Sequence, residues 1–146
     1  MINIDIIAVG RMRDKAQAQL CESYLKRMNW RVNLHEINAK KPADIQAKIF
    51  DKLDDNAFII ALDENGKNLT SQELANKIRQ TVDERTSHIQ FVIGGADGHT
   101  ELLLQNSHFS LSFGSQTWPH MLCRIMLIEQ IYRAQQIISG HPYHRE

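Results

Sequence analysis

The feature that most constrains this fold is a regular alternation of strand-type and helix-type segments. Apolar runs typical of strands occupy residues 2–10, 31–37, 57–62, 89–93 and 109–113. Segments with helical spacing of apolar side chains occupy residues 14–28, 43–53, 70–82, 101–105 and 119–139. Residues 63–68, DENGKN, are typical of a turn. The alternation predicts one α/β domain over residues 1–146, with a mostly parallel sheet and helices on both faces.

Length and charge bound the class of protein. A chain of 146 residues suits one domain, and no apolar run reaches the length of a membrane span. The first ten residues are typical of a strand and not of a secretion signal, so we expect a cytoplasmic protein with no membrane contact. Cys21 and Cys123 lack metal-site spacing, which favours two reduced thiols. Net charge is zero, and the basic residues between 11 and 31 are, on charge alone, most simply a solvated surface.

Three glycines, Gly94, Gly95 and Gly98, follow a predicted strand in FVIGGADGHT. Their spacing matches neither the dinucleotide fingerprint nor the phosphate-binding P-loop. Asp97 and Glu101, expected in or near the first turn of the next helix, would suit the helix dipole and repel a pyrophosphate. Because glycines allow close backbone approach, we expect a small ligand without phosphate, and S-adenosylmethionine, which carries a sulfonium cation, fits.

The last predicted helix is apolar over a broad arc, which indicates burial against more than one surface. One surface is the sheet, and the other is either a second subunit or the core of a monomer. Glu129 and Arg133 are spaced to pair along this helix. The tail that follows, GHPYHRE, can be read as an RNA contact that also handles protons or as an ordinary polar terminus. A metal site is disfavoured because His141 and His144 lack a third ligand.

Three stretches together resemble a known family: FVIGGADG, LSFGSQTWPHMLCRIMLIEQIYRA and HPYHRE. They are similar to the SPOUT-class methyltransferases, and most closely to the bacterial family, methyltransferase H, that methylates ring nitrogen N3 of a pseudouridine in large-subunit (23S) ribosomal RNA. The segments IIAVGRM and ALDENGK agree, so the resemblance runs the length of the chain. It implies a C-terminal trefoil knot, a homodimer, S-adenosyl-L-methionine as cofactor, and ribosomal RNA or the ribosome as partner.

The resemblance also implies roles for individual residues, with no metal. The expected cofactor contacts are Leu62, Gly94, Phe113, Gly114, Ser115, Gln116, Thr117 and Trp118. The tail is expected at the mouth of the cofactor pocket, either that of its own chain or that of the partner subunit. The candidate catalytic residues are His120, Arg133, His141, Tyr143, His144 and Arg145. The candidate RNA-binding residues are Arg11, Arg13 and Lys15. Two alternatives remain at this point: a nucleotide-binding α/β domain and a non-catalytic ribosome-associated protein.

Overall fold

The computed structural model describes residues 1–145, and Glu146, the last residue of the predicted domain, lies outside them. A five-stranded sheet forms the centre of the molecule, with the strand order β2-β1-β4-β3-β5. All four strand pairings are parallel, which confirms the predicted sheet. The strands are β1 (Asn3–Val9), β2 (Arg31–Ile37), β3 (Phe58–Asn68), β4 (His88–Ile93) and β5 (Phe109–Ser112).

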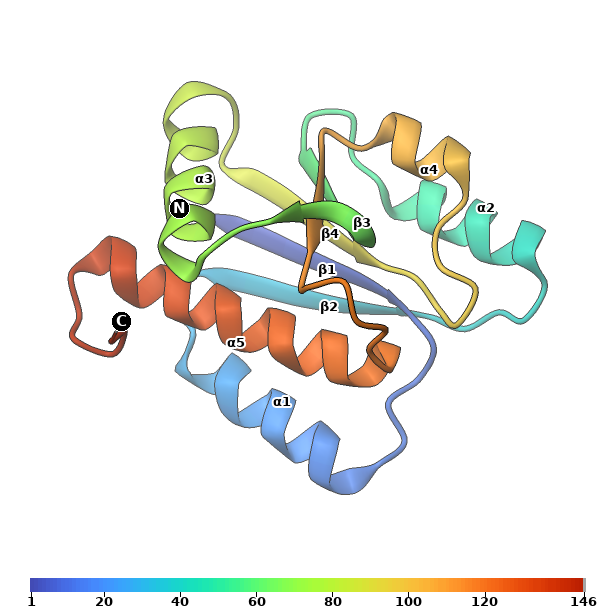
Figure 1. Cartoon of the computed structure of the whole chain (residues 1–146), viewed down its shortest axis with the longest axis horizontal. Coiled ribbons are helices and arrows are strands. Elements are labelled where there is room, and N and C mark those ends of the chain that lie inside the picture. The colour runs from blue at the N-terminus through green and yellow to red at the C-terminus, as the bar shows by residue number, and fades with distance from the viewer. Residues whose placement is uncertain (146) are drawn as a thin grey trace.

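Helices cover both faces of the sheet, as predicted (Figure 1). On one face lie α1 (Lys15–Arg27), α3 (Ser71–Glu84) and α5 (His120–Ser139). On the other lie α2 (Pro42–Lys52) and α4 (Glu101–Asn106). Among residues 1–145, no helix combines the length and the apolar character that crossing a membrane would need.

Strand β1 shows how the core is divided between the two faces. Ile4 and Ile6 point to the α1/α3/α5 face, while Ile7 points to the α2/α4 face, and all three are fully buried. Side chains alternate along a strand, so a strand covered on both faces needs a nearly continuous apolar run. Each such side chain contributes about 1.5–3 kcal/mol when removed from water.

Local capping residues set the helix ends. Asp14 accepts a hydrogen bond from Gln17 N at 2.9 Å at the start of α1. Thr70 and Glu73 form the reciprocal capping box that the sequence predicts for α3. Gly140 ends α5 in the left-handed conformation, with φ of 78°.

Strand β3 extends beyond its predicted end at residue 62, so the predicted turn over residues 63–68 is wrong. The strand continues to Asn68 and pairs with β5 after a register shift between Leu62 and Lys67. A Cβ on Gly66 would lie 2.7 Å from the backbone carbonyl of Ser110, so glycine permits the close approach of the two chains here. Residues that favour a turn locally therefore form a bulge once β5 lies beside them.

Candidate functional site

The carboxyl ends of β3, β4 and β5 enclose a cavity of about 370 Å³, which we call the donor cavity. Ligands of α/β proteins commonly bind at this edge of the sheet. The donor cavity is lined by seven of the eight residues expected to contact cofactor: Leu62, Gly94, Phe113, Gly114, Gln116, Thr117 and Trp118. Ser115 lies exposed in the same loop and is not among the lining residues.

The glycine loop, residues 94–98, folds back tightly on itself at the end of β4. Gly98 N–H donates to Gly95 O at 3.0 Å, and Gly98 has φ of 72°. A Cβ on Gly94 would lie 3.0 Å from the carbonyl carbon and oxygen of Gly98. A side chain at Gly94 would press the loop open, and at Gly98 the positive φ favours glycine although the space around it is free, so the turn depends on both glycines. Asp97 lies in this turn, outside α4, whose N-cap is Thr100, whereas Glu101 lies in the first helical turn as expected.

A second loop, residues 113–118, closes the other side of the donor cavity. The buried Ser112 hydroxyl accepts a hydrogen bond from Gly114 N–H at 3.1 Å. The indole N–H of Trp118 donates to Phe113 O at 3.3 Å. Gly114 has φ of 117°, and a Cβ there would meet no atom within 4 Å. Gly114 therefore adds no side chain to the lining of the donor cavity, and its positive φ favours glycine at this turn.

Three carboxylates, those of Asp63, Glu64 and Asp97, line the donor cavity. Of these three, the sequence pointed only to Asp97, although Asp63 and Glu64 directly follow the apolar run over residues 57–62, which predicts a buried strand. The ends of such strands are where ligand-binding residues collect in parallel sheets. Carboxylates attract a cationic ligand and repel phosphate. This donor set, with two backbone-lined loops, fits S-adenosylmethionine, which carries cations and no phosphate.

His99 supports the glycine loop from within. Its Nε2 lies 3.0 Å from Val92 O. Burial lowers the pKa of His99 below its ordinary value, although the hydrogen bond to Val92 acts in the opposite direction. The ring is therefore neutral at pH 7 and donates its proton to the strand carbonyl.

A second cavity of about 330 Å³ lies across the glycine loop, between that loop and α2. We call it the α2 cavity. It shares residues 94–99 and His120 with the donor cavity. No motif in the sequence of α2 indicated it, because the cavity arises only when α2 packs beside a loop about 50 residues further along the chain.

Arg124 is a fully buried cation in the first turns of α5. Its Nη1 lies 2.6 Å from Glu36 Oε2, and its Nη2 donates to Gly10 O at 2.8 Å. Burial pushes the pKa of Glu36 up, but hydrogen bonds from Met12 N–H and Arg124 hold it below its ordinary value. Arg124 therefore ties the loop after β1 to the end of β2. Sequence reasoning missed it, although an arginine inside an apolar arc is a signal of a buried ion pair.

Residues 2–144 match the family described as "Predicted SPOUT methyltransferase". The chain belongs to the SPOUT methyltransferase family. A protein of Rhodospirillum centenum named "Ribosomal RNA large subunit methyltransferase H" is 42% identical over an alignment of 150 positions, which covers 96% of this chain and 97% of that protein. A protein of the same name from Zymomonas mobilis subsp. mobilis is 41% identical, with 99% of each chain covered.

A solved structure gives an independent comparison of the fold. "The structure of a probable methylase family protein from Haemophilus influenzae Rd KW20" aligns with a TM-score of 0.59 at 12% identity, covering 99% of this chain and 71% of that one. At that identity the likeness concerns the fold alone, and it agrees with the SPOUT assignment. The C-terminal knot expected from the resemblance stays a prediction.

In this SPOUT chain the tail forms a cluster on the C-terminal half of α5. Arg133 pairs with Glu129 at 2.8 Å, as the sequence predicted, and its Nη1 lies 3.1 Å from His144 Nδ1. The Tyr143 hydroxyl donates to Glu129 at 3.1 Å, and its ring packs edge-on against Tyr132 with centroids 4.9 Å apart. Burial, together with Tyr24 and Glu129, raises the pKa of Tyr143 to about 12.

This tail cluster and the donor cavity of the SPOUT chain lie at opposite ends of α5 (Figure 1). His120 begins the helix and lines the donor cavity, whereas Arg133 lies 13 residues later, about 20 Å along the axis. His141 and Arg145 are exposed at the far end. Within one chain, His120 is therefore the one candidate catalytic residue that lines the donor cavity, and the tail does not reach its mouth.

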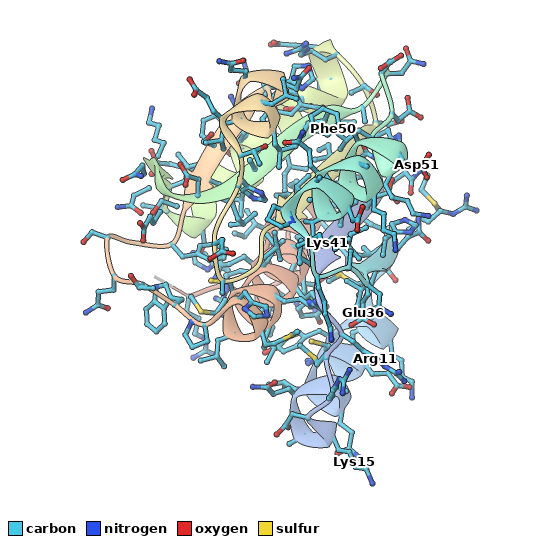
Figure 2. The ribbon with its side chains drawn as sticks, turned by 90° about the vertical axis from the view of Figure 1, so that its right-hand side faces the viewer. Arg11, Lys15, Glu36, Lys41, Phe50 and Asp51 are labelled. Atoms are coloured by element: carbon cyan, nitrogen blue, oxygen red, sulfur yellow. The ribbon has the colours of Figure 1, made fainter. Side chains whose placement is uncertain are left out.

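The candidate RNA-binding residues Arg11, Arg13 and Lys15 are exposed in the loop after β1 and the first turn of α1. Figure 2 shows Arg11 close to Glu36, with Lys15 projecting from the start of α1 away from the sheet. None of the three lines either cavity. Among residues 1–145, no group of three His, Cys, Asp or Glu side chains is placed to hold a metal ion.

Proposed function

We propose that this SPOUT protein uses S-adenosylmethionine to methylate ring nitrogen N3 of a pseudouridine in large-subunit (23S) ribosomal RNA, in the cytoplasm. The donor cavity carries the proposal: two loops with glycines at their turns and the acidic residues Asp63 and Glu64 of β3 line one space. The full-length similarity to proteins named ribosomal RNA large subunit methyltransferase H supports the choice of substrate.

When bound, S-adenosylmethionine supplies an electrophilic methyl group on a sulfonium. Asp63, Glu64 and Asp97 surround that cation with negative charge, and the loops 94–98 and 113–118 orient it. Holding the methyl group and the nucleophile in line lowers the barrier by reducing the entropy lost on reaching the transition state.

The acceptor nitrogen is an imide N–H between two carbonyls, and it is a poor nucleophile while protonated. As the N–CH₃ bond forms and the methyl–sulfur bond breaks, the N3 proton passes to a base. His120 lines the donor cavity and is the candidate in this chain for accepting that proton or for binding the imide oxygen.

We infer that the remaining candidate groups reach the donor cavity from a second copy of the chain. The tail cluster lies too far along α5 to act on its own chain's cavity, so a site containing both requires a homodimer. Large apolar side chains are exposed beside the donor cavity, with Trp118 39% and Leu122 39% accessible. A second subunit that covered this surface would bury both side chains and complete the site.

The test is methyl transfer from S-adenosylmethionine, labelled in its methyl group, to ribosomes or to 23S RNA, followed by mass spectrometry of the nucleosides. The proposal expects label in N3-methylpseudouridine. Thermal-shift measurements with S-adenosylmethionine, NAD and ATP serve as the control, with stabilisation expected from the first ligand. Stabilisation by a dinucleotide with no methyl transfer would instead make this a nucleotide-binding domain.

A further inference from the structure

The donor cavity and the α2 cavity lie side by side. Residues 94–99 and His120 line both of them. Gly94 and Gly95 contribute no side chain to this shared boundary, and His120 begins α5 next to it. Methyl transfer needs reacting atoms about 3–3.5 Å apart, with no protein atom between them. Ligands in the two cavities therefore have to meet past the edge of the glycine loop, beside His120.

The α2 cavity has the chemistry of a site for a pyrimidine ring. Ile45, Ile49 and Phe50 supply apolar surface, and Phe50, which is half-buried, is an aromatic surface on which a base can stack. Gln46 adds an amide that both donates and accepts hydrogen bonds, as the edge of an imide base requires. A volume of about 330 Å³ lies at the small end of the range for ligand pockets.

Positive charge lies at the rim of the α2 cavity. Lys40 is exposed and lines it, and Gly10, which also lines it, is followed directly by the exposed Arg11. In Figure 2, Arg11 and Lys41 lie on either side of Glu36, on the same face as Phe50 of α2. The ion pair of Arg124 with Glu36 and its hydrogen bond to Gly10 hold the Arg11 loop in place. Asp97 lines this cavity as well as the donor cavity, so the cations of the rim, and not the glycine loop, are the groups that complement the phosphates flanking a base.

We propose that the α2 cavity receives the target base of the RNA, turned out of its strand, while the donor cavity holds the cofactor. This inference rests on the methyltransferase function proposed above. Enzymes that modify a base extrude it into a pocket. The acceptor nitrogen and the methyl group then meet beside His120, past the edge of the glycine loop, with no protein atom between them. Gln46 and Phe50 position the base, and Lys40 binds a neighbouring phosphate.

Tryptophan substitutions on α2 test the proposal with a matched control. Gln46→Trp fills the α2 cavity, whereas Ala47→Trp places the same side chain one residue away, at an exposed position that does not line it. In single-turnover methyl transfer to ribosomes, Gln46→Trp should lose on the order of 10²-fold in rate. Ala47→Trp should stay within about twofold of the parent. Titration with S-adenosylhomocysteine should give the parental affinity in both.

A second variant and a direct binding measurement cover the case in which Gln46→Trp fails to fold. Phe50→Leu keeps an apolar side chain but removes the stacking face, and it should slow methyl transfer several-fold, about 1 kcal/mol. In the presence of S-adenosylhomocysteine, pseudouridine 5′-monophosphate should shift the methyl NMR signals of Ile45 and Ile49, which line the α2 cavity. The signal of Ile138, near the C-terminal end of α5 and outside the cavity, should not shift.

The outcomes separate this inference from the function on which it rests. A Gln46→Trp variant that methylates at the parental rate, or mononucleotide that leaves Ile45 and Ile49 unshifted, overturns the base site and leaves the methyltransferase proposal standing. Loss of rate together with loss of cofactor affinity assigns the α2 cavity to the cofactor and also overturns the inference. A parent protein that transfers no methyl group to RNA overturns both.

Discussion

The guanidinium of Arg124 lies 2.6 Å from the carboxylate of Glu36, and this pair joins the first turns of α5 to the carboxyl end of β2. Arg124 is fully buried, while about a third of the Glu36 side chain is exposed. Solvent therefore screens one partner only. The pair also fixes the loop after β1, since Arg124 donates to Gly10 O and Glu36 accepts from Met12 N–H.

Glu36→Gln should lower the free energy of unfolding by about 1–3 kcal/mol, because a buried cation loses its charged partner. Urea denaturation measures this directly. Glu22→Gln is the matched control: its pair with Lys26 is at 3.2 Å and well exposed, so the same change should stay within about 0.5 kcal/mol. Equal effects for the two variants would contradict the structural role given to the Arg124 pair.

Gly94→Val should abolish the close turn of the glycine loop and weaken cofactor binding by at least about tenfold, about 1.4 kcal/mol. The reason is steric, since even a Cβ at this position would lie 3.0 Å from the Gly98 backbone. Calorimetric titration with S-adenosylmethionine gives the affinity. Gly140→Ala, another glycine change but at the far end of α5, should keep the parental affinity. Undiminished binding by a folded Gly94→Val variant would remove this loop from the site.

The position of His99 predicts a pH dependence of stability. Its folded-state pKa is lowered by burial, so below its ordinary value of 6.5 the unfolded chain takes up a proton that the folded chain does not. This contribution is fully present above about pH 6.5 and is lost as pH falls toward the folded pKa. Between about pH 7.5 and 5.5 the parent should lose more stability than His99→Gln, which has no titrating group at this position. Parallel pH profiles would contradict a buried neutral His99.

The order of strands and helices could be predicted from sequence because it depends on local features. The buried strand over residues 57–62 is a continuous apolar run, and the capping box of Thr70 and Glu73 marks the start of α3. The extension of β3 to Asn68 could not be predicted in this way, because its pairing partner, β5, lies about 40 residues further along the chain. Tertiary pairing overrides turn propensity in that segment.

The candidate site was predicted in part. Seven of the eight residues that the resemblance implied as cofactor contacts line the donor cavity. They could be named from the sequence because the motifs that carry the resemblance form the loops of the cavity. The distance between His120 and the tail follows from the predicted helix over residues 119–139, because a helix rises about 1.5 Å per residue. Arg124 and the α2 cavity depend on contacts between distant elements, which no local pattern records.

Complementation between two inactive variants tests whether the tail acts across subunits. Deleting residues 143–146 should reduce methyl transfer strongly and leave cofactor affinity near the parental value, since none of the tail residues that the structure describes, 141–145, lines the donor cavity. Gly94→Val inactivates the other half of the site. Co-expressed in one cell, the two variants should regain activity, because a mixed dimer pairs one intact cavity with one intact tail. If mixed dimers form but remain inactive, the tail does not act across subunits.

Methylation of N3 of a pseudouridine in 23S ribosomal RNA can be tested in cells. Mass spectrometry of that RNA compares cells lacking the gene with cells carrying the parent gene or Gly94→Val. One N3-methylpseudouridine should disappear in the deletion strain and should be restored by the parent gene but not by Gly94→Val. If N3-methylpseudouridine is unchanged in the deletion strain, this chain does not make it and the proposed function is wrong.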